Sequence, residues 1–239
     1  GITFKNFDIK DFKKIIEKKG LFLFPSGPGL SSIENEIPYL KALKNADYNF
    51  FDSGYFVLLL KYFKKIDVNK FSGYLFIKLF LEYIKKNNNK KLFLVDPNIR
   101  LSVSNTKLFN KIGVIKKNIN NYIAPQYNSK TISDRKLLNI IKKIKPEYIL
   151  LNIGGGTQEI LGLYLKNNIH FKCTIICSGA AISFFTGDQA PMNVFFDKIY
   201  LGWLIRIIFN PRVFLPRYLK SIKLIHIVLN NKIKIFKSK

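Results

Sequence analysis

Short apolar runs that alternate with longer stretches of helical spacing constrain the fold of this chain most strongly. Five runs rich in branched and aromatic residues have the length of buried strands, and each precedes a turn-forming residue: Leu21–Phe24, Tyr48–Phe51, Leu92–Val95, Tyr148–Leu151 and Cys173–Cys177. Apolar spacing predicts helices between them, over Tyr55–Lys65, Tyr74–Lys86 and Arg135–Ile144. This alternation predicts an α/β fold with a mostly parallel, Rossmann-like sheet and flanking helices.

A shift in composition near Phe196 marks a second part of the chain. From Phe196 to Lys239 there are ten lysines and arginines and one acid, Asp197, with aromatic and branched apolar residues between them. No apolar run there approaches the roughly 20 residues that cross a bilayer. We therefore expect an α/β core over residues 1–195 and a basic, amphipathic helical appendage over residues 196–239, which we call the appendage.

The appendage suits an anionic surface, either a membrane or a nucleic acid. The net charge of +25 is a weak guide, because lysines are interleaved with Ile, Asn and Phe throughout. Outside the appendage, a solvated basic surface explains them equally well. Three of the few arginines, Arg206, Arg212 and Arg217, fall within twelve residues of each other, beside Trp and Phe. The chain lacks an RNP-like motif or a basic helix-turn-helix pattern, so we expect a membrane partner and no nucleic acid.

The two cysteines, Cys173 and Cys177, lie in the apolar stretch FKCTIIC. A disulfide framework needs more cysteines and metal knuckles use other spacings, so both are expected to be buried thiols. The N-terminal GITFKNFDIKDF lacks the apolar core of a signal peptide. We expect a reducing, intracellular compartment.

Residues that directly follow the predicted strands are the best candidates for ligand contact, because ligands of parallel sheets bind beyond the carboxyl ends of the strands. We call these residues the rim; they include Ser26, Asp52, Gly154–Glu159 and Ser178-Gly179. Glycines admit a ligand close to the backbone, and amides at a helix start favour an anion. The rim therefore suits a nucleotide diphosphate.

The rim segment GGGTQE is neither a P-loop nor a G-x-G-x-x-G fingerprint. Taken alone, it indicates a tight strand-to-helix turn in which Gln158 caps the next helix. Asp52 also has two readings. It suits a general base that takes the proton of an acceptor hydroxyl, and it equally suits the N-cap of the Tyr55–Lys65 helix.

No Asp-x-Asp pair exists in the chain, although enzymes that hold a nucleotide diphosphate through a divalent metal commonly use one. We therefore expect no metal and no cofactor. Arginines or backbone amides would then neutralise the diphosphate.

In order along the chain, these segments resemble the WecG/TagA/CpsF family of bacterial glycosyltransferases, from about Leu21 to Leu219. The strongest match is the block that contains Ala190-Pro191, Trp203, Arg206, Pro211, Arg212 and Arg217-Tyr218. FFDSGY resembles the family's Asp-Gly segment and places Asp52 on its proposed catalytic aspartate. FSGYLF, with Ser72 and Gly73, resembles its Thr-Gly, and GGGTQE resembles its Gly-x-Pro-x-Gln-Glu turn.

The resemblance implies an inverting, metal-independent transfer of a sugar, often of the N-acetylmannosamine type, from a UDP-sugar to a polyprenyl-diphosphate-linked acceptor. Cell-surface polysaccharide or glycolipid synthesis would be the process, and the cytoplasmic face of the membrane the place. Asp52 and Ser26 would be catalytic residues, and Arg206, Arg212 and Arg217 would bind the diphosphate. The implied substrate-binding residues are Lys70, Ser72, Gly154, Gln158, Glu159, Ser178 and Gly179.

Several positions depart from the family pattern. Ser26 lies in a loop that reads Thr-x-Asn-Pro in the family, Lys70 replaces an arginine, Gly156 a proline and Gly202 a glutamate. These changes leave open a second function, that of a catalytically degenerate relative that binds a nucleotide-sugar or a partner at the membrane. Within the appendage, we expect Trp203–Tyr218 to complete the active site and Lys220–Lys239 to adhere to the membrane.

Overall fold

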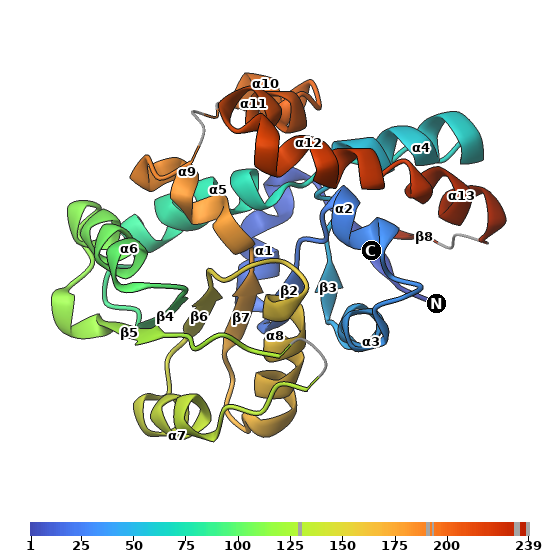
Figure 1. Ribbon diagram of the computed structural model, residues 1–239. Helices are drawn as coiled ribbons and strands as arrows, with labels where there is room; N and C mark the ends of the chain where they lie inside the picture. The colour runs from blue at the N-terminus through green and yellow to red at the C-terminus, as the bar shows by residue number, and fades with distance from the viewer. Residues whose placement is uncertain (129–130, 190–191, 193, 232–234, 238–239) are drawn as a thin grey trace.

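The structure is a computed structural model that describes residues 1–128, 131–189, 192, 194–231 and 235–237. Within them, the main sheet has six strands in the order β3-β2-β7-β6-β4-β5, and every pairing is parallel (Figure 1). The strands are β2 (Gly20–Leu23), β3 (Tyr48–Asn49), β4 (Leu92–Asp96), β5 (Ile119–Ile123), β6 (Tyr148–Leu151) and β7 (Thr174–Cys177).

Helices cover both faces of this sheet. One face packs against α1 (Phe12–Glu17), α5 (Gly73–Lys86) and α6 (Ile99–Lys111). The opposite face packs against α3 (Ile37–Asn45), α7 (Arg135–Ile144) and α8 (Thr157–Asn168). The remaining elements of the core are α2 (Gly27–Ser31), α4 (Gly54–Lys64), α9 (Ser183–Thr186) and 3-10 turns at Ile9–Asp11, Lys116–Asn118 and Gly179–Ile182.

Successive side chains of each strand enter different cores, because neighbouring residues of a strand point to opposite faces of the sheet. In β6, Ile149 and Leu151 join the cluster of α3, α7 and α8, whereas Tyr148 and Leu150 join that of α1, α5 and α6. All four are buried almost completely. This burial on both faces explains why the central strands read as continuous apolar runs.

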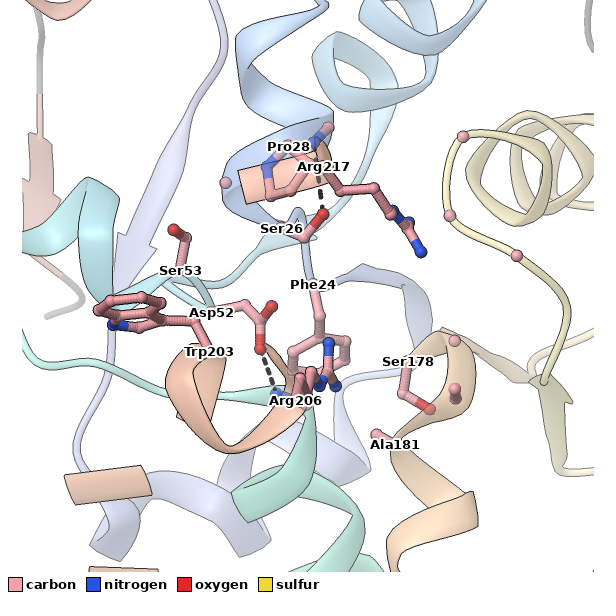
Figure 2. Close-up of a pocket in the computed structure, with 18 of the residues that line it drawn as sticks. Phe24, Ser26, Pro28, Asp52, Ser53, Ser178, Ala181, Trp203, Arg206 and Arg217 are labelled. Atoms are coloured by element: carbon pink, nitrogen blue, oxygen red, sulfur yellow. Dashed lines mark hydrogen bonds between the residues drawn. The ribbon is translucent and has the colours of Figure 1, made fainter. Parts of the chain in front are cut away.

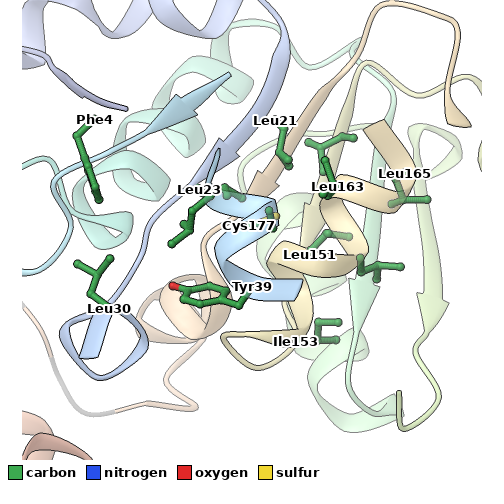
Figure 3. Packing of buried hydrophobic residues seen from close by; sticks show 14 of the residues in the cluster. Phe4, Leu21, Leu23, Leu30, Tyr39, Leu151, Ile153, Leu163, Leu165 and Cys177 are labelled. Carbon is green, nitrogen blue, oxygen red and sulfur yellow. The ribbon is translucent and has the colours of Figure 1, made fainter. Parts of the chain in front are cut away.

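Gly162 lets α8 lie close to the sheet. A Cβ at this position would come within 2.8 Å of both Cys177 Sγ and Leu21 Cδ1. Figure 3 shows Cys177 and Leu21 among the apolar residues that pack beneath α8. Cys177 and Cys173 are buried free thiols, which confirms the expectation from the sequence.

The predicted α/β fold with a mostly parallel sheet is confirmed. All five predicted strands are present, although β3 spans only Tyr48–Asn49, and the three predicted helices match α4, α5 and α7 to within a residue at each end. The strand β5 was not predicted. Its sequence, INNYI, is mostly polar and only partly buried, because β5 lies at the sheet edge beside β4 alone.

The appendage forms four helices within the described residues and returns to the start of the chain. These are α10 (Val194–Lys198), α11 (Gly202–Phe209), α12 (Pro211–Lys220) and α13 (Lys223–Asn230), and β8 (Ile235–Lys237) then pairs in parallel with β1 (Phe4–Asn6). Figure 1 shows α12 above the sheet and α13 to one side of it, beside α4. The boundary at residue 195 stays a prediction.

The helices of the appendage differ in their surroundings. Leu224, Ile227 and Val228 of α13 are buried and belong to the core cluster that contains α3, α7 and α8. In contrast, α11 and α12 bury none of their side chains. Their exposed apolar residues include Leu204, Ile208, Phe209, Val213, Leu215 and Leu219. Within the described residues, no helix is long and apolar enough to cross a membrane.

Candidate active site

A cleft of about 1360 Å³ lies over the carboxyl ends of the strands. Residues that follow β2, β3, β4, β6 and β7 line it on the side of the sheet, and residues of α11, α12 and the start of α13 line it on the other side. The lining includes Ser26, Asp52, Gly154–Glu159 and Ser178-Gly179. The folded chain therefore brings the rim residues, which are far apart in sequence, into one cleft beneath the appendage.

Asp52 is a partly buried carboxylate in this cleft (Figure 2). Its Oδ1 accepts a hydrogen bond of 2.7 Å from the backbone N–H of Gly73. Burial raises the pKa of Asp52 to about 6, although the Gly73 hydrogen bond and the charges of Lys70 and Arg206 act to lower it. Such a carboxylate is ionised at neutral pH and holds a proton more readily than an exposed one, as a general base requires.

Asp52 is not the cap of the helix that follows it. The N-cap of α4 is Ser53, whose Oγ accepts a 3.2 Å hydrogen bond from the N–H of Phe56. The N-cap reading of Asp52 is therefore wrong. Among the described residues, no hydrogen bond reaches Asp52 Oδ2, so this oxygen is available to a ligand in the cleft.

Ser26 begins α2 and faces the same cleft. Its Oγ accepts a hydrogen bond of 3.3 Å from the N–H of Gly29, which makes it the N-cap of that helix. Ser26 keeps its hydroxyl proton for a further contact, since this bond uses it only as an acceptor. Figure 2 shows Ser26 and Asp52 in the same part of the cleft. A catalytic role for Ser26 stays a prediction.

The glycine-rich turn after β6 is capped by Glu159, not by Gln158. Gly156 has a φ of 89°, a left-handed conformation that glycine adopts without strain. Glu159 Oε2 accepts a 2.6 Å hydrogen bond from the N–H of Gly156, which completes the helix start. The Gln158 amide instead donates to Glu159 Oε1 and to the carbonyl of Cys177, at 3.0 Å each. The reading of Gln158 as a cap is therefore wrong.

This turn leaves polar atoms without partners next to the cleft. Within the described residues, Gln158 Oε1 and Ser178 Oγ are buried and make no hydrogen bond. Gly179 follows Ser178 with a φ of 60°, a left-handed conformation that favours glycine. Both Gln158 and Ser178 line the cleft, so a bound substrate could satisfy them. Their role in substrate binding stays a prediction.

Glu159 is almost fully buried, and burial raises its pKa to about 7. The charge of Asp52 adds to this rise, whereas its hydrogen bonds with Gln158 and Gly156 oppose it. Both of its carboxylate oxygens are engaged by protein groups. Glu159 therefore holds the shape of the turn, and its predicted contact with substrate remains untested.

Lys70 and Ser72 both contact Asp197 of α10. The Lys70 ammonium lies 2.5 Å from Asp197 Oδ1 and 2.7 Å from the carbonyl oxygen of the same residue. The Ser72 hydroxyl donates to Asp197 Oδ2 at 2.7 Å and accepts from the N–H of Leu75 at 3.1 Å, so it also caps α5. These two residues, predicted to bind substrate, hold the appendage in this structure. Asp197 was not singled out from the sequence, although it is the single acid of the appendage.

The three predicted diphosphate ligands occupy different positions. Arg206 and Arg217 line the cleft, whereas Arg212 is exposed and is not among the lining residues. The Arg206 guanidinium lies 5.0 Å from the ring centroid of Phe184, and both Arg206 and Arg217 lie near the ring of Phe214. No ion pair of the described residues includes either arginine, so both remain free to meet an anion.

Sequence reasoning also missed Tyr200, another appendage residue that lines the cleft. It packs against Gly54, where a Cβ would lie 2.8 Å from Tyr200 Cδ1. The Gly54 position beside Asp52 was a signal that another segment comes close.

Ala190-Pro191, which also contributed to the resemblance, lie outside the described residues. In the described part of the chain, no group of His, Cys, Asp or Glu is arranged to hold a metal ion; metal independence stays a prediction.

Comparison with known proteins agrees with the ordered motifs. Residues 1–238 match the family model described as "Glycosyl transferase WecG/TagA/CpsF family", which is nearly the whole chain. None of the curated proteins compared with this sequence matches it. The match includes both the sheet and the appendage, so the two parts of the cleft lie within the same family region.

Proposed function

Because the chain belongs to the WecG/TagA/CpsF family of glycosyltransferases, we propose that it transfers a sugar from a UDP-sugar to a polyprenyl-diphosphate-linked acceptor. The family supports glycosyl transfer in cell-surface polysaccharide synthesis. The finer terms are proposals: a sugar of the N-acetylmannosamine type or a related one, inversion at the anomeric carbon, and no metal requirement.

The state of Asp52 is the observation that carries this proposal. Its pKa of about 6, its open Oδ2 and its place in a cleft that has free cations on the other side form the arrangement needed for a general base. An aspartate that caps a helix or lies on the surface would not combine these three properties. The cleft also places Arg206 on the appendage side, where its charge acts on Asp52.

The proposed reaction is a single displacement. The acceptor hydroxyl oxygen attacks the anomeric carbon of the donor, and Asp52 takes the proton of that hydroxyl. The bond between the anomeric carbon and the diphosphate oxygen breaks, and UDP leaves with the electron pair. Attack from the face opposite UDP inverts the configuration. The products are the lengthened acceptor, UDP and a protonated Asp52, which returns its proton to water.

The departing UDP gains negative charge that the site has to stabilise. Arg206 and Arg217 are the cleft-lining arginines available for this role, and Arg presents a planar fork that suits phosphate oxygens. Fixed cations in a cleft stabilise charge that develops in the transition state. The chain has no Asp-x-Asp pair that could hold a divalent metal. This also supports the proposal that arginine side chains neutralise the diphosphate.

We also propose that the acceptor reaches the cleft from an anionic membrane surface. The exposed apolar residues of α11 and α12 share these helices with Arg212, which is exposed and lies outside the cleft lining. Apolar and basic residues on one exposed helix are typical of a helix that lies in the membrane interface. A lysine or arginine near an anionic leaflet contributes about 1 kcal/mol each at moderate salt. The proposed membrane-facing residues are those of α11 and α12 and not the expected Lys220–Lys239 segment, because α13 has its apolar face in the core.

Substitution of Asp52 by asparagine tests the proposed base. The variant keeps the shape of the side chain and removes its ability to accept a proton. A panel of UDP-sugars is offered with a polyprenyl-diphosphate-linked GlcNAc acceptor, product is read by mass spectrometry, and UDP binding is measured by calorimetry. We expect transfer to fall by about 100-fold or more while UDP binding changes little.

Asp67→Asn is the matched control, because Asp67 is exposed and does not line the cleft. Undiminished turnover by Asp52→Asn would remove Asp52 as the base. A wild-type protein that binds UDP-sugars but transfers to no acceptor would instead indicate the catalytically degenerate relative.

A further inference from the structure

We propose that Asp197 is a positioning residue that fixes the appendage to the loop supporting Asp52. We call Lys70, Ser72 and Asp197 together the latch. The inference rests on the proposed function, because it assigns Asp197 an effect on the base of that reaction.

The latch is a nearly dry contact between segments 127 positions apart in sequence. The side chains of Lys70 and Asp197 are 10% and 12% exposed, and Ser72 is buried. Both carboxylate oxygens and the carbonyl of Asp197 are engaged, by the Lys70 ammonium and the Ser72 hydroxyl. A buried carboxylate with all of these partners is held in one position, since loss of any partner leaves a charge or a polar group unsatisfied.

The loop between Lys70 and Gly73 connects the latch to Asp52. Lys70 and Ser72 contact Asp197 with their side chains. Phe71 and Gly73 contact the segment of Asp52 with their backbone N–H groups. Phe71 N–H donates to the carbonyl of Phe51 at 3.0 Å, and Gly73 N–H donates to Asp52 Oδ1 at 2.7 Å. A shift of the latch therefore moves the hydrogen-bond donor that orients the base.

The latch also determines the charge around the base. Lys70 acts to lower the pKa of Asp52, Asp197 acts to raise it, and Arg206 of α11 acts to lower it. Glu159 of α8 and Tyr39 of α3 also interact with the charge of Asp52. Because Asp197 neutralises Lys70, the cations that the cleft offers a diphosphate come from the appendage: Arg206, Arg217, Lys220 and Lys223. The same pair thus docks the appendage and sets the environment of Asp52.

Single and double substitutions at the latch separate these effects. Asp197→Asn leaves Lys70 uncompensated, Lys70→Met leaves Asp197 uncompensated, and the double variant Lys70→Met/Asp197→Asn removes both charges. Docking is followed by acrylamide quenching of Trp203, the only tryptophan in the sequence, which lies in α11 and contacts Tyr218. We expect acrylamide to quench Trp203 more strongly in each single variant than in the wild type. The increase in the double variant should be smaller than the sum of the two single increases.

The pH dependence of kcat/KM gives a second readout that a purely structural contact would not produce. Loss of the Asp197 charge is expected to move the acid limb to lower pH, and loss of the Lys70 charge to move it to higher pH. General loosening of the cleft would instead hydrate Asp52 and move the limb in the same direction in both variants. We also expect kcat/KM to fall by about tenfold to a hundredfold in Asp197→Asn.

Asp67→Asn again serves as the control, with unchanged quenching and pH dependence. If the latch variants show the same Trp203 quenching as this control, the proposal is overturned. It is also overturned if the acid limb of kcat/KM moves in the same direction in Asp197→Asn and Lys70→Met. A wild-type protein without transferase activity would defeat the proposed function, whereas the quenching experiment would still decide whether Asp197 docks the appendage.

Discussion

Replacement of Leu224 by alanine tests whether α13 is part of the folded core. Leu224 is 1% exposed and belongs to the same cluster as residues of α3, α4 and α8. The substitution removes three buried carbons, which forfeits roughly 2–3 kcal/mol at about 0.8 kcal/mol for each carbon. The cavity that remains raises the expected loss to about 3–5 kcal/mol.

Urea denaturation followed by circular dichroism measures this loss. With a denaturant slope of about 2–3 kcal/mol/M for a chain of this size, the midpoint should fall by roughly 1–2 M. Ile222→Ala is the matched control, because Ile222 precedes the same helix and is 58% exposed. Its stability should stay within about 0.5 kcal/mol of the wild type.

Equal and small effects of the two substitutions would refute the packing of α13 against the core. In that case the apolar face of α13 would be available for the membrane, and Lys220–Lys239 would recover the role expected from its sequence. A large loss confined to Leu224 would instead mean that deletion of this segment is unsuited to a test of membrane binding, because it would unfold part of the protein.

Two further predictions concern pH and the membrane. The pKa of Glu159 in the folded protein, about 7, lies above its ordinary value of 4.5. The contribution of Glu159 to the free energy of unfolding is therefore complete below about pH 4.5 and is lost as the pH rises through 7. In urea titrations at pH 5 and at pH 8, we expect the loss of unfolding free energy between the two pH values to be smaller in Glu159→Gln than in the wild type, by about 2.5 kcal/mol. Equal losses in the two proteins would contradict this. Ile208→Ser and Phe209→Ser, at exposed residues of α11, should reduce flotation with anionic liposomes, whereas Ile37→Ser, at a 73% exposed residue of α3, should not; equal flotation of all three would place the membrane contact elsewhere.

The central strands could be predicted because their burial on both faces leaves a direct record in the sequence. The edge strand β5 leaves no such record, since none of its residues is fully buried. Strands β1 and β8 are three residues long, and their pairing joins segments far apart in the sequence. The rim rule placed Asp52 and Gln158 in the cleft, because parallel strands all end at the same edge.

Contacts between distant side chains could not be predicted from local patterns. Lys70 was expected to bind substrate, and its partner Asp197 lies 127 positions away, in a segment whose acid is easily overlooked among ten basic residues. The segment Lys220–Lys239, which includes α13, was expected to adhere to the membrane, because its sequence does not show what covers its apolar residues. The structure covers the apolar face of α13 with the core, whereas the faces of α11 and α12 stay exposed.

The order of the elements along the chain determines when the cleft forms during synthesis. The central strand β7 is also the last strand of the main sheet to leave the ribosome, so the sheet can close only after Cys177 has emerged. The segments that cover the cleft follow on the order of seconds later, at usual rates of translation. Until α11 and α12 have emerged, the sheet carries Asp52 in a cleft that lacks its appendage side. A ribosome stalled after α9 would therefore carry a sheet with only one of the two sides of the cleft.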